Sequence, residues 1–239
     1  MLNNSCHRAL TLLSCQAVPA GLTREAIVRA ALDLLDETGL DRLTMRALAA
    51  RLGVAAPALY WHFASKQALL DEMATTVWRR VGQVMAGLPG DLPWPEIMAT
   101  YAATVRDELL GHRDGPKAFS GTTLTDPAVV RRQEHTFASL TRQGFTLEDA
   151  ARALLLVHHF TIGFCVEEQA VSQAVASGDE RYAPGRRAEL IGPENAPLAA
   201  GAGQVIFGDP GSRFADLISV LLEAADRMRR DGNAGPPPR

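Results

Sequence analysis

The sequence predicts an all-α protein with a small N-terminal helical domain followed by a larger helical one. Ala and Leu are abundant, whereas aromatic residues make up only 6% of the 239 residues. Apolar side chains recur at the i, i+3, i+4 spacing of a helix in several separate segments, and no segment alternates between apolar and polar residues for the length of a convincing strand. Capping residues at the ends of these segments support the same fold class.

The first three helices are expected to be short and closely spaced. Thr23 can cap a first helix that Gly39 ends, and Thr44 can cap a second that Gly53 ends. Pro57 stands where a third helix can begin, about three residues later. The side chains expected to face the core of these helices are Ile27, Ala30, Ala31, Leu34, Leu35, Leu48, Leu52, Leu59 and Phe63.

A fourth helix is expected after Ser65, with Leu69, Leu70, Met73 and Val77 inward, and the Pro- and Gly-rich segment 87–95 interrupts the pattern. Later helices are expected at about 96–111, 126–142, 147–175 and 212–229. Residues 177–211 are weakly periodic and predict a mobile loop with one short helix. The expected organisation is a disordered arm (1–20), a first domain (21–68), a larger domain (69–231) and a disordered tail (232–239).

Charge and cysteine content restrict the class of protein. The net charge is −3, but residues 40–66 hold four basic residues against Asp41, so this segment carries +3 and the rest −6. Cys6, Cys15 and Cys165 form neither a disulfide framework nor a four-cysteine zinc site, which fits a reducing cytoplasm. No stretch approaches the roughly 20 uninterrupted apolar residues of a membrane-spanning helix, so no membrane association is expected.

Residues 44–63 fit a helix-turn-helix unit, in which the second of two short helices enters the major groove of double-stranded DNA. Thr44 and the amides beside it can face phosphate, and Arg46 can reach a base or the backbone. The small side chains from Ala55 to Ala58 permit close approach to the groove. Lys66, at the start of the next helix, adds a positive charge for another phosphate.

Tyr60, Trp61 and His62 are an unusual cluster for so short a helix. The alternative is that the aromatic residues form the core of a small domain. Because successive helical residues point about 100° apart, Leu59 and Phe63 can share an inward face, whereas Trp61 and His62 must point elsewhere. The basic surroundings favour DNA contact for these two.

These residues resemble the DNA-binding signature of the TetR family of bacterial regulators, and the Tyr-Trp-His triplet resembles its tetracycline-repressor branch. The resemblance rests on Leu43–Arg46, Leu48-Ala49, Leu52–Val54, Pro57–Phe63, Lys66 and Leu69–Asp71, and continues in Arg113–Lys117, Gly144-Phe145, His159–Gly163 and Glu167–Gln169. It implies a cytoplasmic repressor that binds a palindromic operator as a homodimer and is released by a small molecule. It places at DNA-contact positions Thr44, Arg46, Ala56, Pro57, Ala58, Tyr60, Trp61, His62 and Lys66. Ala56 and Ala58 replace polar residues of the tetracycline repressor, so a different operator is expected.

The resemblance also implies that two late helices of each subunit form a four-helix dimer bundle. The last helix carries an apolar stripe that suits this role: Phe214, Leu217, Ile218, Leu221, Leu222 and Ala225. The alternative is an ordinary core helix, and the pattern does not distinguish the two.

The effector pocket departs from the tetracycline-repressor pattern. Glu167 matches a carboxylate near the metal, and His159 matches another pocket position, but Phe119 replaces the metal-binding histidine and Thr123 replaces a basic residue. His158 and His159 are adjacent and cannot jointly bind one ion. No metal or other cofactor is therefore expected.

The remaining pocket positions predict a hydrophobic or aromatic effector, such as an antibiotic or a metabolite. The candidate ligand-binding residues are Tyr101, Val105, Phe119, Thr122, Thr123, Thr136, Leu154, His158, His159 and Glu167. The alternative is a DNA-binding regulator without an effector. An enzyme is not expected, because the sequence contains no nucleophile elbow, phosphate loop or metal-ligand spacing.

Overall fold

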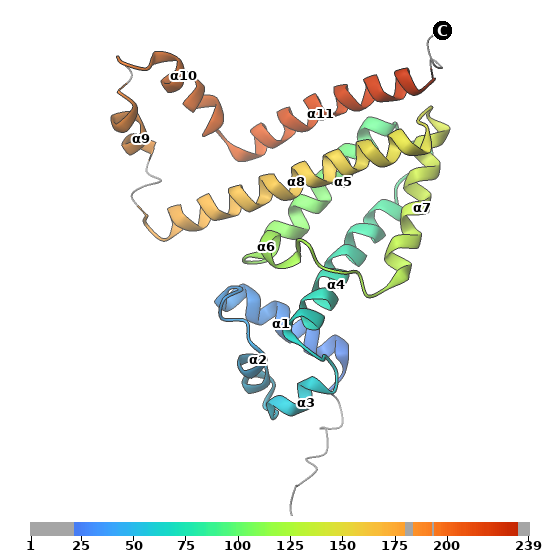
Figure 1. Ribbon diagram of the computed structural model, residues 1–239, viewed down its shortest axis with the longest axis vertical. Helices are drawn as coiled ribbons and strands as arrows, with labels where there is room; N and C mark the ends of the chain where they lie inside the picture. The colour runs from blue at the N-terminus through green and yellow to red at the C-terminus, as the bar shows by residue number, and fades with distance from the viewer. Residues whose placement is uncertain (1–21, 180–183, 193, 234–239) are drawn as a thin grey trace, which may run out of the picture.

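The computed structural model describes residues 22–179, 184–192 and 194–233, and every regular element among them is a helix. Helices α1–α3 form a small unit at one end, α4 leads away from it, and α5–α8 and α11 form the larger body (Figure 1). The helices are α1 (Arg24–Thr38), α2 (Met45–Leu52), α3 (Ala56–Tyr60), α4 (Lys66–Ala86), α5 (Trp94–Leu110), α6 (Gly115–Phe119), α7 (Pro127–Arg142), α8 (Leu147–Ala176), α9 (Pro184–Ile191), α10 (Pro197–Ile206) and α11 (Pro210–Asn233).

The predicted helix starts in the N-terminal unit are confirmed by their caps. The hydroxyls of Thr23, Thr44 and Ser65 each accept a hydrogen bond of 3.1 Å from the backbone N–H three residues later. Such a cap contributes about 1 kcal/mol. Gly53 ends α2 in the left-handed conformation, with φ at 66°, as the sequence predicts.

One hydrophobic cluster joins the N-terminal unit to the body through α4. Leu69 and Met73, near the start of this helix, pack with the core of α1–α3, and Val81 and Met85, near its end, belong to the same cluster. The cluster continues to Phe119 at the end of α6. The expected domain boundary at residues 68/69 therefore falls in the first turn of a helix that both domains share.

Helix α8 packs against α5 and α11 in the body. Ala102 of α5 and Val157 of α8 form a buried cluster with two residues of α11, Phe214 and Ile218. By length and mean hydropathy, 1.2 over its most apolar window, α8 is also apolar enough to cross a membrane. Core helices of other proteins meet the same criterion, and one side of α8 packs against α5 and α11.

Three segments differ from the sequence-based expectation. The segment 177–211 contains two helices, α9 and α10, rather than one, and a short helix, α6, was not expected. None of the side chains of α10 is buried, so it lacks the inward apolar stripe by which a helix is recognised. Helix α11 begins at Pro210 and ends at Asn233, within the segment expected to be a tail. The predicted arm, and the tail beyond residue 233, lie outside the described residues.

The stripe assigned to dimerisation lies mostly inside the chain. Phe214, Ile218 and Ala225 are buried against α5 and α8, so the core-helix alternative applies to them. Leu221 and Leu222 are half-buried at the edges of the same clusters, and only Leu217 of the six is exposed. The spacing alone could not separate these roles, because a core and a partner helix require the same apolar period.

A buried ion pair fixes α8 to α5. Arg106 Nε donates to Glu168 Oε2 at 2.9 Å, and a second Arg106 nitrogen contacts the other carboxylate oxygen. The Glu168 side chain is 8% exposed. The hydrogen bonds to the Glu168 carboxylate raise the pKa of Arg106. Burial lowers it by a smaller amount, so the pKa is raised overall. Of the two adjacent glutamates, Glu168 therefore has a structural role, whereas Glu167 is exposed.

Arg106→Ala is expected to lower the free energy of unfolding by about 3 kcal/mol, because it leaves the buried Glu168 carboxylate without its partner. Urea unfolding followed by circular dichroism measures this. Arg152→Ala removes an exposed ion pair with Glu148 on α8 and should change stability by less than about 1 kcal/mol. Equal effects of the two substitutions would contradict the assignment.

Candidate DNA-binding and effector sites

Helices α2 and α3 present the predicted recognition surface at the free end of the N-terminal unit. Trp61 is 83% exposed and Tyr60 is 52% exposed, whereas Leu59 and Phe63 are buried. Trp61 and Tyr60 therefore point away from the core, as helical geometry requires. Pro57 and Thr44 are exposed beside them, and Ala56, Ala58 and His62 are half-buried.

Arg24 holds the end of the recognition segment in place. From α1, it donates to the backbone oxygen of His62 and, at 3.0 Å, to Glu72 on α4. Its guanidinium also lies 4.2 Å from the centre of the Phe63 ring. The orientation of α3 is thereby tied to both α1 and α4.

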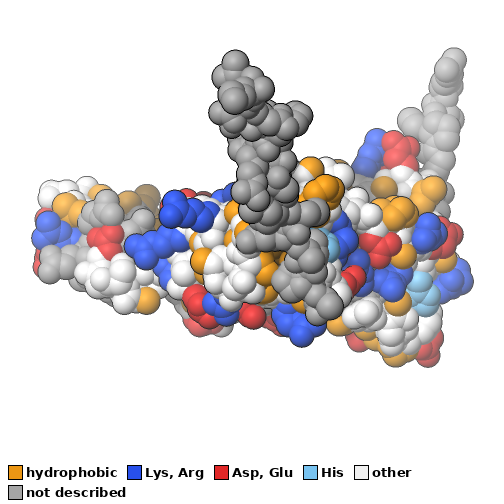
Figure 2. All heavy atoms as spheres, turned by 90° about the horizontal axis from the view of Figure 1, so that it is seen from below, with side chains coloured by type: hydrophobic (Ala, Val, Ile, Leu, Met, Phe, Trp, Pro, Cys, Tyr) orange, Lys and Arg blue, Asp and Glu red, His pale blue; other side chains and the backbone are white. Residues whose placement is uncertain are grey.

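The basic residues of this segment differ in their availability for DNA. Arg51 forms a two-pronged ion pair with Glu37 at 2.6 and 2.9 Å, and Lys66 donates to the carbonyl of Leu40 at 3.1 Å. Arg46 is exposed and makes no ion pair with a described residue. Viewed from this end, Lys and Arg side chains lie on the surface with acidic side chains among them (Figure 2). Arg46 is thus a freer cation than Arg51 or Lys66.

A cavity of about 280 Å³ lies in the body among α4, α5, α7, α8 and the segment that follows α6. Six of the ten candidate ligand-binding residues line it: Tyr101, Phe119, Thr122, Thr136, Leu154 and His158. Trp78, Val81, Gly82 and Met85 of α4 form another wall, and Arg132 and Gln133 of α7 complete it. The sequence analysis missed all of these residues. Arg132 and Gln133 were missed because the Arg131–Glu134 run has the composition of a solvated helix face.

Four candidate residues lie elsewhere. Val105 is buried in the main cluster, and the backbone N–H of Thr123 donates to Asp71 at 3.2 Å on the outside of the cavity. His159 and Glu167 are exposed on α8. His159 follows Leu155 by four residues and Glu167 follows His159 by eight, so the three lie along one outward ridge of this helix.

The polar groups of the cavity are mostly neutral. The Tyr101 hydroxyl and His158 Nδ1 are 2.8 Å apart and hydrogen-bonded. Burial raises the pKa of Tyr101, and burial, followed by the charge of His159, lowers the pKa of His158. Both groups are therefore uncharged near neutral pH. The Trp78 ring centre lies 5.3 Å from that of His158, which places an aromatic wall beside this pair.

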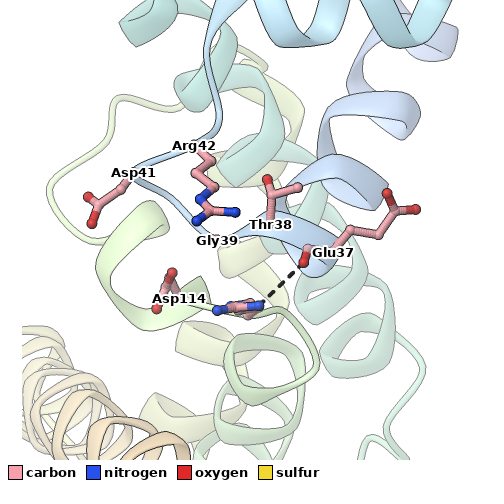
Figure 3. A pocket seen from close by; sticks show the side chains of 7 residues that line it. Glu37, Thr38, Gly39, Asp41, Arg42 and Asp114 are labelled. Atoms are coloured by element: carbon pink, nitrogen blue, oxygen red, sulfur yellow. Dashed lines mark hydrogen bonds between the residues drawn. The ribbon is translucent and has the colours of Figure 1, made fainter. Parts of the chain in front are cut away.

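A second hollow lies where the N-terminal unit meets α6 (Figure 3). Asp114 Oδ2 accepts a 2.9 Å hydrogen bond from the backbone N–H of Leu40, and Arg113 donates to the backbone oxygen of Glu37 at 3.3 Å. A Cβ at position 39 would lie 2.8 Å from the Asp114 carboxylate, so the close approach requires Gly39. The hollow is lined by polar and charged groups that hold the two domains together, and it lacks the apolar walls of the cavity.

His112 connects this junction to the cavity. Its Nδ1 lies 3.0 Å from Asp36 of α1, and its Nε2 lies 2.9 Å from Arg80 of α4. The edge of its ring meets the Phe119 ring, with the centres 5.7 Å apart. Phe119 lines the cavity. Its side chain therefore lies between the cavity and His112, which contacts the N-terminal unit.

Two family models match the chain. The model for bacterial regulatory proteins of the tetR family matches residues 27–73, and the model for the tetracyclin repressor-like C-terminal domain matches residues 86–223. The chain belongs to the TetR family. It is a TetR-family transcription regulator with a helix-turn-helix DNA-binding domain and a ligand-binding C-terminal domain, and the relatives that match it are regulators rather than enzymes.

Individual relatives agree with the family match. The class A tetracycline repressor protein from transposon 1721 of Escherichia coli is 40% identical over 87% of this chain and 92% of its own. A crystal structure of a possible TetR-family regulator from Streptomyces coelicolor A3(2) is 36% identical, with a TM-score of 0.70, and covers 86% of this chain and all of the other. TetR (class A) in complex with 5a,6-anhydrotetracycline and magnesium is 29% identical, with a TM-score of 0.64, over 86% and 99% of the two chains.

The residues present in this TetR-family chain do not fit a magnesium site. Magnesium prefers oxygen donors, and the buried Phe119 side chain offers no donor atom of any kind. Within the described part of the chain, no three His, Cys, Asp or Glu side chains are placed to hold a metal ion. The chemistry of the cavity is that of an apolar site with hydroxyls, one imidazole and one guanidinium.

Proposed function

We propose that this protein is a cytoplasmic repressor that binds a palindromic operator as a homodimer and is released by a hydrophobic or aromatic effector in the α4–α8 cavity. The observation that carries the proposal is the dual position of α4. Leu69 and Met73, near its start, belong to the core under the recognition helix, and Trp78, Val81 and Gly82 form a wall of the cavity. A ligand that displaces this wall also displaces the base of the DNA-binding domain.

The junction at α6 provides a second connection. Phe119 lies between the cavity and His112, which contacts Asp36 of α1. A ligand that moves Phe119 therefore alters the contact between the body and α1. Because a dimer reads two half-sites about 34 Å apart, a small rotation of each N-terminal unit mismatches the recognition helices with successive major grooves.

The homodimer is supported by the outward faces of α8 and α11, which lie side by side (Figure 1). Leu155 is 52% exposed on α8, and Leu217 and Val220 are 39% and 58% exposed on α11. Two copies that meet through these faces form a four-helix bundle with one self-complementary interface. His159 and Glu167 share the outward ridge with Leu155, so any ligand contact that they make requires the partner copy.

Ligand release is tested by a gel shift of the full chain on its own promoter fragment, titrated with aromatic antibiotics such as anhydrotetracycline in the absence of magnesium. Gly82→Leu is expected to raise the effector concentration for release by at least about tenfold, because the new side chain narrows the cavity beside Arg132, and the same gel shift without effector measures DNA binding by this variant. Gly82→Ala is the matched control, since its methyl group meets Arg132 at an ordinary 3.5 Å. DNA binding that no compound changes would favour the alternative, a regulator without an effector.

Trp61→Ala is expected to weaken operator binding by about tenfold or more. Because Trp61 is exposed, the free energy of unfolding should change by less than about 0.5 kcal/mol. Fluorescence anisotropy with a labelled operator at fixed salt measures the affinity. Val130→Ala, an exposed apolar residue on α7, is the control. Unchanged affinity in the Trp61 variant would remove this residue from the DNA interface.

Leu217→Glu is expected to shift the protein from dimer to monomer, because it places a charge in the proposed bundle. Val84→Glu introduces the same charge at an exposed apolar position on α4 and should leave the dimer intact. Size-exclusion chromatography with light scattering measures the mass of each variant. A dimer that persists in the Leu217 variant would place the interface on another face.

A further inference from the structure

The described residues that line the cavity carry one positive charge and no negative charge. Arg132 of α7 supplies the charge, and no Asp or Glu is among them. His158, the other titratable base in the wall, has its pKa lowered by burial and then by His159. The remaining lining residues are apolar or neutral. The cavity wall therefore has an excess of positive charge among mainly apolar and neutral side chains.

Arg132 makes no ion pair with a carboxylate in the described part of the chain; the pKa of Asp126 is lowered chiefly by the backbone hydrogen bond from Ala128, and the charge of Arg132 is the smallest of the influences on it. The Arg132 Nη1 atom is fully covered and makes no hydrogen bond. Its aliphatic stem crosses α4 at Gly82, where the Arg132 Cδ lies 3.5 Å from the position of a Cβ. The stem therefore packs beside position 82 at an ordinary contact distance, and Arg132 forms part of the cavity wall.

Of the acids near Arg132 in the sequence, Glu134 is exposed, and Asp126, which caps α7, has other partners. Asp126 accepts from the backbone N–H of Ala128 at 2.8 Å and from Arg79 at 3.2 Å. Other partly buried arginines of the body have carboxylates of their own. Arg106 is bonded to Glu168, and Arg80 Nε, although it lacks hydrogen-bond geometry, lies 2.7 Å from Glu108 Oε2. Arg132 differs from them in facing a cavity instead of an acid.

A covered guanidinium nitrogen without an acceptor is costly, and the cost is recovered when an acceptor arrives. The planar fork of arginine matches a carboxylate, to which it donates two parallel hydrogen bonds. A neutral aromatic amide would fill the cavity equally well, but it offers one acceptor oxygen and no negative charge. The cavity thus distinguishes ligands by charge as well as by shape.

We propose that the effector carries an anionic group, a carboxylate in the simplest case, which accepts hydrogen bonds from Arg132. Its aromatic body lies against Trp78 and Phe119, and its polar substituents reach the Tyr101–His158 pair. The volume of about 280 Å³ suits a small aromatic acid. This inference rests on the proposed function, because it specifies the chemical class of ligand for the same cavity.

The test compares 2-naphthoate with 2-naphthamide, which have nearly the same shape and differ in charge. Isothermal titration calorimetry of the full-length protein, without DNA, is expected to show that the acid binds at least about tenfold more tightly. Arg132→Gln should remove this preference and leave the affinity for the amide within about twofold. Arg131→Gln, an exposed neighbour on α7, should keep the preference.

A second variant guards against loss of folding. Arg132→Lys retains the charge without the fork, so part of the preference for the acid should remain. Thermal melting confirms that each variant is folded. Equal affinity for the two compounds in the wild-type protein, including no binding of either, contradicts the inference, as does a preference that survives Arg132→Gln. If the acid is preferred but does not release DNA in the gel shift, the proposed release fails while the inference stands.

Discussion

The structure depends on the burial of one face of α4. Leu69, Met73, Val77, Val81 and Met85 recur along this helix and belong to a single hydrophobic cluster that includes the cores of both domains. Burial of each such side chain contributes about 1.5–3 kcal/mol, so neither domain can shift on α4 without exposing apolar surface of the other. The same constraint explains why the helix-turn-helix unit ends inside a helix rather than at a flexible linker, and why the wall of a cavity can affect a DNA-binding surface.

Charged side chains in the body have two kinds of surroundings, one in the buried ion pair and one in the cavity wall. Arg106 and Glu168 are held together at the interface of α5 and α8, where each satisfies the other. Arg132 faces a space that no carboxylate of the described residues enters. A charge that the fold satisfies stabilises the fold, whereas a charge left facing a cavity is available to a ligand. The distinction lies in position rather than in residue type.

Much of the fold could be predicted because local rules governed it. Thr23, Thr44 and Ser65 are capping residues at the starts of amphipathic segments, and each forms the expected cap. The segment 177–211 was expected to hold one short helix and holds two, since an exposed helix such as α10 has no inward stripe by which it could be recognised. The cavity residues predicted from the sequence lie on four different segments, and the contribution of α4 and of Arg132 to the cavity could not be found, because it depends on which helices meet.

The helical fold class, the helix-turn-helix unit and the outward orientation of Trp61 follow from periodicity, caps and the 100° step between helical residues. Which side of α11 faces the chain, and which arginine is paired, depends on how helices distant in the sequence pack together. Phe214 and Leu217 are equally apolar in the sequence, but one packs on α5 and α8 and the other is exposed. A side chain is buried by neighbours that are distant in the chain, so no local sequence pattern predicts its burial.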